Sequence, residues 1–321
     1  MSAPLRYVIF GDGDSPHLAK WVRALSPRTE LWVASSRGLR EEVQALVPAE
    51  RRLLLDGHSA PGGGNVAMLR ALPRLTRWLR QVDPDWINPH YLTSHGLLAW
   101  LASGGWRTWP PGPPLRAHLL GSAWGSDILV APQRSLAYQA VTRRVLRGCA
   151  LTTSDSIHMA SRMRELGAGE VMVFPFGLET MPAMPETKDR WLFYANRGLE
   201  PIYRPQAVLE LFARIAEQQP LARLVVANDG SLRPALESWV HQRGLRERVR
   251  FVGRLSATEQ AHWYEQSQWY LSLPSSDAVA VSVIEAMAHG CIPLLSALPA
   301  NRELVEPGVS GPLLRPDDEW P

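Results

Sequence analysis

Cysteine is scarce in this sequence, and it contains no long apolar run. The two cysteines, Cys149 and Cys291, lie far apart and lack the spacing of metal ligands. This excludes a disulfide framework and a cysteine-based zinc site. No apolar segment approaches the roughly 18 residues that span a bilayer, so we expect no transmembrane helix. The first residues lack the basic region and apolar stretch of a signal peptide, and we therefore expect a cytoplasmic chain.

Lysine is also scarce, and several ligand-binding motifs are missing. Only Lys20 and Lys188 occur, so almost all positive charge is carried by arginine. The turn after the first apolar segment has neither G-x-G-x-x-G nor a Walker lysine, which argues against a dinucleotide or ATP phosphate site. No D-x-D motif suggests Mg²⁺ or Mn²⁺ binding, and no obvious pair of acids suggests a glycosidase. We therefore predict no metal and no cofactor.

The charge differs between the two halves of the chain. Residues 1–185 carry 20 Lys and Arg against 14 Asp and Glu, a net +6, whereas residues 186–321 carry 14 against 17, a net −3. A basic first half could contact an anionic membrane surface or hold a phosphate-bearing acceptor. Solvated arginines with no partner explain the same numbers equally well. Nucleic acid is not a predicted partner, because no dense basic run is interleaved with aromatic residues.

The order of apolar and amphipathic segments predicts an α/β fold. A length of 321 residues suggests two domains. Short apolar runs alternate with amphipathic stretches, including a helix around residues 66 to 81, and this βαβ rhythm restarts after residue 180. Residues 181–188 (MPAMPETK) are rich in proline and read as a linker. We therefore predict domains at 1–180 and 189–321.

The segment Leu271 to Leu314 contains the most informative pattern. It reads as a strand, a loop, a helix from about Ser282 to Gly290, and a second strand. Glu285 follows Ser282 by three residues, so the pair could form a capping box. Alternatively, Glu285 could face the crevice at the carboxyl end of the sheet, where ligands of such folds bind.

This segment resembles the family-four retaining glycosyltransferases of GT-B fold. Their pattern is an acidic residue, seven further residues, and a Glu in an E-A-M-A-x-G helix, matched here by Asp277 and Glu285. The first acid is usually Glu, so Asp277 departs from the pattern. The resemblance implies two Rossmann-like domains facing across a cleft. It also implies that Asp277 contacts the donor sugar, Glu285 the ribose hydroxyls, and the N–H groups near Ser282 and Val283 the phosphates.

The second domain contains further residues that resemble the donor site of this family. Arg197 follows the strand LFYAN in the setting N-R-G-L, as the family's phosphate-binding arginine does. No lysine follows it, and Arg204 is the nearest substitute, although a surface role for Arg204 is as plausible. Gly253 and Arg254 resemble the loop that flanks the base, or they simply end a strand. The resemblance assigns Arg197 to the departing diphosphate.

The first domain contributes a glycine pair and two polar residues. Gly11 and Gly13 form a tight turn between strand and helix, and the resemblance places their backbone beside the donor diphosphate. His90, after the strand DWINPH, resembles the family's histidine near the transferred sugar. Asp127 resembles the acid of an H-G-x-D segment on the acceptor side, although the preceding residues differ. His95 has no comparable context.

Taken together, these residues predict a retaining glycosyltransferase that needs no metal. The donor is a nucleotide-diphosphate sugar, with UDP or GDP as the nucleotide. The acceptor is a hydroxyl of a glycan or lipid-linked acceptor in cell-surface polysaccharide synthesis, and contact with the inner membrane face is possible. A nucleotide-sugar epimerase and a non-catalytic nucleotide-sugar-binding protein are the alternatives. Family members continue past this point with helices that return to the first domain, and we expect these to be absent from a chain that ends at Pro321.

Overall fold

The chain forms two compact α/β units, which confirms the predicted fold class. A computed structural model describes residues 4–55, 66–105 and 115–315. The units are Met1–Phe174 and Pro175–Pro321. Residues 181–188 contain no helix or strand, and the division itself falls slightly earlier, after Phe174. In the described part of the chain, no helix has both the length and the apolar character needed to cross a membrane.

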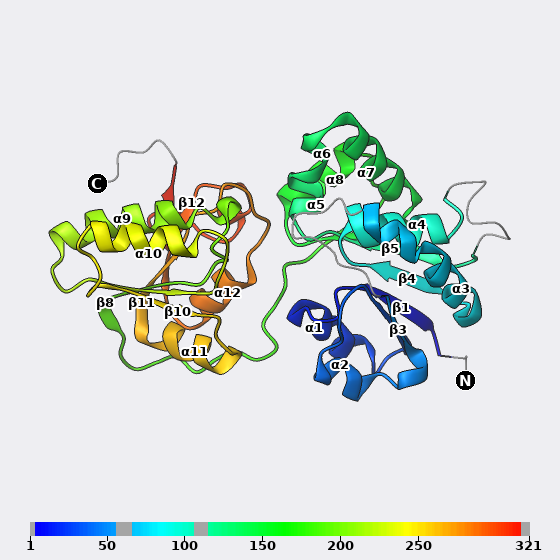
Figure 1. Ribbon diagram of the computed structural model, residues 1–321, viewed down its shortest axis with the longest axis horizontal. Coiled ribbons are helices and arrows are strands. Elements are labelled where there is room, and N and C mark those ends of the chain that lie inside the picture. The colour runs from blue at the N-terminus through cyan, green and yellow to red at the C-terminus, as the bar shows by residue number, and fades with distance from the viewer. Residues whose placement is uncertain (1–3, 56–65, 106–114, 316–321) are drawn as a thin grey trace. The chain divides into compact units, whose positions relative to one another are not determined.

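The first unit is built on a parallel sheet with the strand order β3-β2-β1-β4-β5-β6-β7 (Figure 1). Its strands are β1 (Arg6–Gly11), β2 (Glu30–Ser35), β3 (Arg52–Leu54), β4 (Trp86–Pro89), β5 (His118–Ser122), β6 (Leu151–Ser154) and β7 (Val171–Val173). Its helices are α1 (Pro16–Leu25), α2 (Glu41–Leu46), α3 (Leu72–Val82), α4 (Leu97–Ala102), α5 (Ser126–Leu129), α6 (Ala131–Arg134), α7 (Leu136–Gly148) and α8 (Ile157–Glu165). Because β1 pairs with both β2 and β4, the strand order reverses between β1 and β4. Ligands of such sheets bind at the carboxyl ends of the strands flanking this reversal.

Helix α1 shows how local sequence directs the chain away from β1 and back onto the sheet. Ser15 is the N-cap and its hydroxyl accepts a hydrogen bond from the His17 N–H. Pro16 occupies the first turn, where its missing N–H costs nothing. The buried face of α1 (Leu18, Ala19, Val22) packs with α2 against β1 and β2.

The second unit has a parallel sheet in the order β10-β9-β8-β11-β12-β13. Its strands are β8 (Asp189–Ala195), β9 (Arg223–Ala227), β10 (Val249–Gly253), β11 (Ser267–Ser272), β12 (Ile292–Ser296) and β13 (Leu313–Leu314). Its helices are α9 (Pro205–Gln218), α10 (Arg233–Gln242), α11 (Ala257–Gln266) and α12 (Val281–Ala288). The strand order reverses between β8 and β11. These two strands pair with each other, and β8 also pairs with β9 and β11 with β12.

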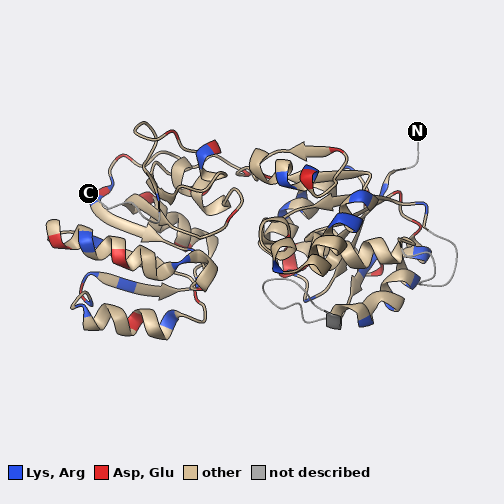
Figure 2. Ribbon diagram, turned by 90° about the horizontal axis from the view of Figure 1, so that it is seen from above, with Lys and Arg blue, Asp and Glu red and all other residues tan. Residues whose placement is uncertain are grey.

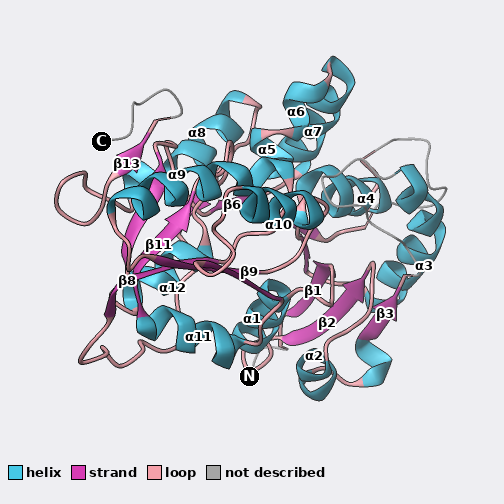
Figure 3. Ribbon diagram, turned by 60° about the vertical axis from the view of Figure 1, so that its left-hand side comes forward, coloured by secondary structure: helices cyan, strands magenta, loops and turns pink. Residues whose placement is uncertain are grey.

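Alternate residues of the second sheet enter two separate cores. Phe193 and Leu271 pack on one face with α9 and α10, whereas Tyr194 and Tyr270 pack on the other with α11 and α12. This alternation is the period of two expected of strands covered on both faces. Figure 3 shows helices on both sides of the strands in this unit.

Candidate active site

The strand reversal of the second unit brings three predicted donor-site residues together. Arg197 lies two residues beyond β8, Asp277 lies in the loop after β11, and Ser282 lies in the first turn of α12. The Arg197 guanidinium donates to Asp277 Oδ2 at 2.5 Å and to Ser282 Oγ at 3.2 Å. Arg197 is 80 positions from Asp277 and 85 from Ser282 in the sequence, and it meets them because β8 and β11 are neighbours.

The Arg197 side chain is held on several sides. Its guanidinium carbon lies 4.5 Å from the centre of the Tyr203 ring, a cation–π distance. Both side chains of the Arg197–Asp277 ion pair are less than 20% exposed (18% and 19%). Burial raises the pKa of Asp277, and the positive charge of Arg197 opposes this rise. Arg197 Nε is buried and has no acceptor in the described part of the chain, so one donor remains for a ligand.

Glu285 does not close a capping box with Ser282, so that alternative is wrong. Helix α12 begins one residue earlier, at Val281, and its N-cap Ala280 makes no side-chain hydrogen bond. Ser282 accepts from Arg197 instead. Glu285 Oε2 accepts a hydrogen bond from the Tyr264 hydroxyl at 3.3 Å. Gly290, with φ 75°, ends the helix as predicted.

A buried polar network beneath this cluster was not predicted. Asn196 Nδ2 donates to the Tyr264 hydroxyl at 2.7 Å, and the Tyr270 hydroxyl donates to Asn196 Oδ1 at 2.7 Å. The network therefore links Asn196, which precedes Arg197, to Tyr264, which donates to Glu285. Tyr264 and Tyr270 resemble ordinary core residues in the sequence. The available signal was Asn196, a polar residue immediately after an apolar strand.

The remaining predicted donor-site residues differ in how they are placed. The Val283 N–H donates to Ala280 O at 3.0 Å, so it is not free for a phosphate. The N–H groups of Val281 and Ser282 precede it in the first turn, where a helix provides no acceptors. Gly253 has φ 74°, which favours glycine, and Arg254 beside it is exposed.

The predicted replacement for the missing lysine also has a defined place. Arg204 follows the short helix η4 (Pro201–Tyr203) that presents Tyr203 to Arg197, and it starts α9 with a left-handed φ of 48°. Lys188 lies at the opposite edge of the sheet, before β8, where its Nζ donates to Tyr264 O and Ser267 O. A hollow of about 700 Å³ lies at that same amino edge, lined by the first residues of β8, β9 and β10. It is therefore not the predicted donor site.

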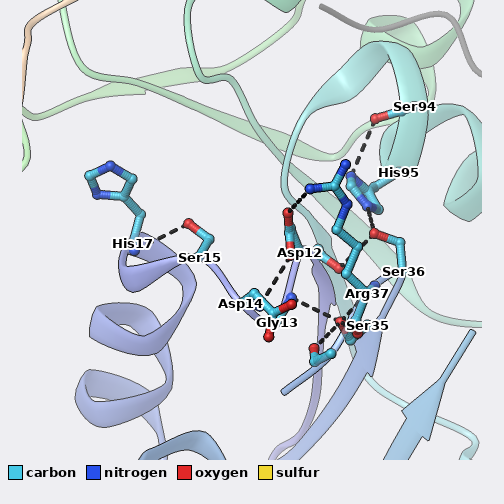
Figure 4. A network of polar contacts seen from close by, with 12 residues as sticks. Asp12, Gly13, Asp14, Ser15, His17, Ser35, Ser36, Arg37, Ser94 and His95 are labelled. Atoms are coloured by element: carbon cyan, nitrogen blue, oxygen red, sulfur yellow. Dashed lines mark hydrogen bonds and ion pairs between the residues drawn. The ribbon is translucent and has the colours of Figure 1, made fainter. Parts of the chain in front are cut away.

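In the first unit, the packing of the chain leaves little room for a side chain at the two predicted glycines. A Cβ on Gly13 would lie 2.4 Å from the Gly38 carbonyl oxygen, and one on Gly11 would lie 2.6 Å from Leu18 Cδ1. The Gly13 N–H donates to Ser35 Oγ at 2.8 Å (Figure 4). These contacts account for the absence of a side chain at both positions, and the contact of their backbone with the donor diphosphate stays a prediction.

His90 lies immediately beyond β4 at the strand reversal of the first unit. Its side chain is 4% exposed, and its Nε2 lies 3.1 Å from Asn88 Oδ1. The rings of Trp21 and Trp124 flank it, with centroids 5.5 and 5.3 Å away. Burial lowers the pKa of His90 to about 3, so the imidazole is neutral at physiological pH. Tyr91, the next residue, has φ 78°, a strained conformation typical of functional loops.

His95 belongs to a buried network that the sequence did not indicate. It lies on the short π-helix η3 (Leu92–Gly96), a feature frequent at functional sites. Its Nε2 lies 2.9 Å from Ser36 Oγ, and burial lowers its pKa to about 4. Figure 4 shows it beside Arg37, which pairs with Asp12 at 3.7 Å. These residues follow the carboxyl ends of β1, β2 and β4.

Asp127, predicted on the acceptor side, is buried and bonded within the first unit. Its side chain is fully buried, and its two oxygens accept from the Leu92 N–H at 2.8 Å and the Trp124 N–H at 3.0 Å. Burial raises the pKa of Asp127 to about 6, and these N–H groups oppose the rise. The carboxyl group therefore joins the loops after β4 and β5.

Comparison with known proteins identifies the family. The profile of the family described as Glycosyl transferase 4-like domain matches residues 15–177, which is half of the chain. A second profile, Glycosyl transferases group 1, matches residues 180–320. The chain belongs to the group 1 glycosyltransferases. The two matched ranges correspond to the two units of the structure.

Individual relatives of this glycosyltransferase chain are distant. Alpha-monoglucosyldiacylglycerol synthase of Streptococcus pneumoniae is 26% identical over 108 residues, a match that spans 34% of this chain and about a quarter (24%) of that relative. Sucrose-phosphate synthase of Thermosynechococcus elongatus has a similar structure, with a TM-score of 0.77, 16% identity and coverage of 98% and 86% of the two chains. Anabaena HepE in complex with UDP-glucose also has a similar structure, with a TM-score of 0.74, 15% identity and coverage of 98% of this chain and 86% of HepE. These similarities establish the GT-B fold.

Proposed function

We propose that this chain is a retaining, metal-independent glycosyltransferase. It would move a sugar from a nucleotide-diphosphate sugar, with UDP or GDP as the nucleotide, to a hydroxyl of a glycan or lipid-linked acceptor. The observation that carries the proposal is the meeting of Arg197, Asp277 and Ser282 at the strand reversal of the second sheet. The HepE structures with UDP and with UDP-glucose support UDP as the nucleotide.

The cluster has the chemistry that a departing diphosphate requires. Breaking the bond between the anomeric carbon and the phosphate oxygen leaves negative charge on the diphosphate. In this proposal, Arg197, with its unused Nε donor, and the first-turn N–H groups of α12 stabilise that charge. The acceptor hydroxyl attacks from the same face, and its proton passes to the leaving phosphate oxygen. The chain then acts by positioning and electrostatics.

Carboxylates near the cluster suit the hydroxyls of the donor. Asp277 and Glu285 each offer two acceptor oxygens, which can bind vicinal hydroxyls. Asp277 would bind the sugar, and Glu285, held by Tyr264, would bind the ribose. The assignment of Asp277 implies that it exchanges its bond with Arg197 for bonds to the sugar when the donor binds.

A lipid-linked acceptor at a membrane surface fits the basic first unit. The name of the pneumococcal relative points to a diacylglycerol-based lipid as the product of that enzyme. Figure 2 shows Lys and Arg on outer helices of the unit that carries the N-terminus. The exposed arginines of α3 and α7 are Arg74, Arg77, Arg80, Arg143, Arg144 and Arg147. Such helices would be attracted to anionic lipid headgroups.

The test is calorimetric titration of the chain with UDP, GDP, dTDP and ADP in the presence of EDTA. We expect selective binding of one diphosphate, and its loss in Glu285→Ala. Glu217→Ala is the matched control, because Glu217 is an exposed glutamate of α9 outside the cluster. Absence of binding by the folded chain would contradict the proposal.

The alternatives are separated by following the bound donor. A transferase consumes the donor only with an acceptor, apart from slow hydrolysis, and gives a product with the donor's anomeric configuration in an NMR spectrum. An epimerase converts the donor alone, and a non-catalytic protein binds it without turnover. Two observations favour testing the non-catalytic alternative. Asp277 is paired with Arg197, and Lys188 lies too far from this pair to serve as the missing lysine.

A further inference from the structure

The orientation of the Asn88 side chain is fixed by its neighbours. Asn88 is fully buried, and its Nδ2 lies 2.6 Å from the Leu120 carbonyl oxygen and 2.9 Å from Ser122 Oγ. A carbonyl oxygen can only accept a hydrogen bond, so the NH₂ group must face Leu120. Thr153 donates its own hydroxyl to Ser122 Oγ at 3.0 Å, which completes the set. The amide oxygen of Asn88 therefore faces His90.

This orientation determines which nitrogen of His90 carries the proton. His90 Nε2 lies 3.1 Å from Asn88 Oδ1, an acceptor, so Nε2 must be the N–H donor. In a neutral imidazole the other nitrogen, Nδ1, is then a bare acceptor. Nδ1 is buried and has no hydrogen-bond partner among the residues that the structure describes. A buried acceptor without a hydrogen bond destabilises the folded chain, so such an atom is rare unless it has a function.

We propose that Asn88 is a positioning residue that holds His90 as the Nε2–H tautomer, so that Nδ1 accepts a hydrogen bond from a hydroxyl of the transferred sugar. The proposal rests on the proposed glycosyltransferase function and extends it to a residue outside the predicted site. His90 acts here as a neutral acceptor. It neither takes nor gives the reaction proton.

The surroundings of His90 favour a neutral imidazole and cover its acceptor nitrogen, Nδ1. Trp21, on α1, and Trp124, in the loop between β5 and α5, flank the ring. Trp124 lies outside any helix or strand, and in this proposal its side chain moves aside when the sugar binds and admits a hydroxyl to Nδ1. The titratable groups acting on His90, His17 and His95, both disfavour its protonated form. No acidic partner is among the contacts of the His90 ring in the described residues, so nothing there favours an imidazolium.

The first test reads the tautomer directly, without any substrate. The full chain is labelled with ¹⁵N-histidine, and long-range ¹H–¹⁵N spectra show which ring nitrogen carries the proton in each of its nine histidines. The His90 signal is the one lost in His90→Gln. We expect the Nε2–H pattern in the parent chain, a mixture of tautomers in Asn88→Leu, and an imidazolium in Asn88→Asp. Ser122→Ala is the matched control, since it removes another Asn88 contact and leaves the pattern unchanged.

The second test measures whether the tautomer matters for the sugar. Calorimetry gives the ratio of UDP-glucose affinity to UDP affinity for each folded variant. We expect His90→Gln, Asn88→Leu and Asn88→Asp to lower this ratio about 3- to 10-fold, the effect of one neutral hydrogen bond, with UDP binding unchanged. Ser122→Ala keeps the parental ratio.

Several outcomes would overturn the inference. A parental His90 with its proton on Nδ1 would do so, as would an Asn88→Leu or Asn88→Asp chain that keeps the Nε2–H pattern and the parental ratio. Two variants at Asn88 are included, so that the test can still be made with one of them if the other fails to fold. If UDP binds none of the chains, the proposed function fails, and the spectra still decide whether Asn88 sets the tautomer.

Discussion

At the scale of single residues, the Arg197–Asp277 pair places opposite charges at the predicted donor site. The two side chains lie 2.5 Å apart and mostly shielded from water, so their attraction is stronger than that of a surface pair. A nucleoside diphosphate that approaches Arg197 meets the carboxylate of Asp277 at the same time. The carboxylate repels it.

The first prediction follows from this repulsion. Asp277→Asn removes a negative charge beside the bound diphosphate and leaves the Arg197 guanidinium free to bind it. We expect UDP to bind about fivefold more tightly, equivalent to about 1 kcal/mol, and the gain to shrink in high salt. Calorimetric titration at two salt concentrations measures both effects.

A matched control exists at the other edge of the same sheet. Asp189 pairs with Arg223 at the same distance of 2.5 Å, at the amino ends of β8 and β9. Asp189→Asn therefore changes the net charge equally without touching the predicted donor site, and UDP affinity should not change. Equal gains in both variants would mean that the effect is one of overall charge, and the assignment of Asp277 would fail.

Asp127 gives a second prediction, in pH dependence. Its pKa is raised to about 6 in the folded chain, whereas an unfolded Asp titrates near 3.8. The folded chain thus binds an extra proton between these values, so the contribution of Asp127 to stability falls as pH rises from 4 to 6. Asn does not titrate. The stability advantage of the parent over Asp127→Asn should be larger at pH 4.5 than at pH 7, by about 2 kcal/mol.

Urea unfolding at the two pH values tests this sign. An advantage that instead grows with pH would show that the N–H groups of Leu92 and Trp124 outweigh burial. The carboxylate would then be the favoured form in the folded chain.

At the scale of elements, two helices of the second unit begin in different ways. Helix α11 begins with a complete capping box, in which Ser256 Oγ accepts from the Glu259 N–H and Glu259 accepts from the Ser256 N–H. Ala280, the N-cap of helix α12, makes no such bond, and Ser282 in the first turn is bound to Arg197. One serine stabilises its helix, and the other belongs to the predicted site.

The third prediction compares these two serines. Ser256→Ala should lower the free energy of unfolding by about 1 kcal/mol and leave UDP binding unchanged. Ser282→Ala should weaken UDP binding and cost little stability, because it caps nothing. Thermal unfolding and calorimetry of both variants give the comparison. The reverse pattern would restore the capping interpretation of Ser282 and Glu285.

The sequence predicted elements better than the contacts between them. The apolar run LFYAN and the polar residues after it predicted β8 and Arg197, because a strand end in a parallel sheet has a known place. The helix expected around residues 66 to 81 is α-helical only from Leu72, with η2 (Val66–Ala71) before it. Pro73, suited to a first turn, marks that start. His95 and Tyr264 were missed because their polar partners are distant in the sequence and their types are common in cores.

At the scale of the whole molecule, each unit has its own hydrophobic core and its own sheet. The break in apolar rhythm near residue 180 was enough to predict two domains, because it is a local property of the sequence. The first-unit core under α1 depends on Gly13, whose neighbours leave no room for a side chain. Of the predicted donor residues, Arg197, Asp277, Ser282 and Glu285 lie in the second unit.

The fourth prediction is that the units respond separately to heat. Gly13→Ala should lower the melting temperature of one calorimetric transition by a destabilisation of about 1–3 kcal/mol. UDP at about 100 times its Kd should raise the other by about 2.7 kcal/mol. Gly169→Ala is the control, because a Cβ there meets no atom within 4 Å. A shift of the same single transition by both changes would show that the units unfold together.

If Arg197 and Asp277 bind the donor as proposed, their buried ion pair would also make the chain selective before any catalysis takes place. An inorganic phosphate or a nucleotide without a sugar can satisfy Arg197 only by leaving Asp277 with a buried, unmatched charge. A nucleotide sugar brings an anion for the arginine and hydroxyls for the carboxylate in one molecule, so both groups exchange one partner for another. Since phosphates are far more abundant in a cell than any one sugar donor, the resting pair would keep the site available for the ligand that carries both groups.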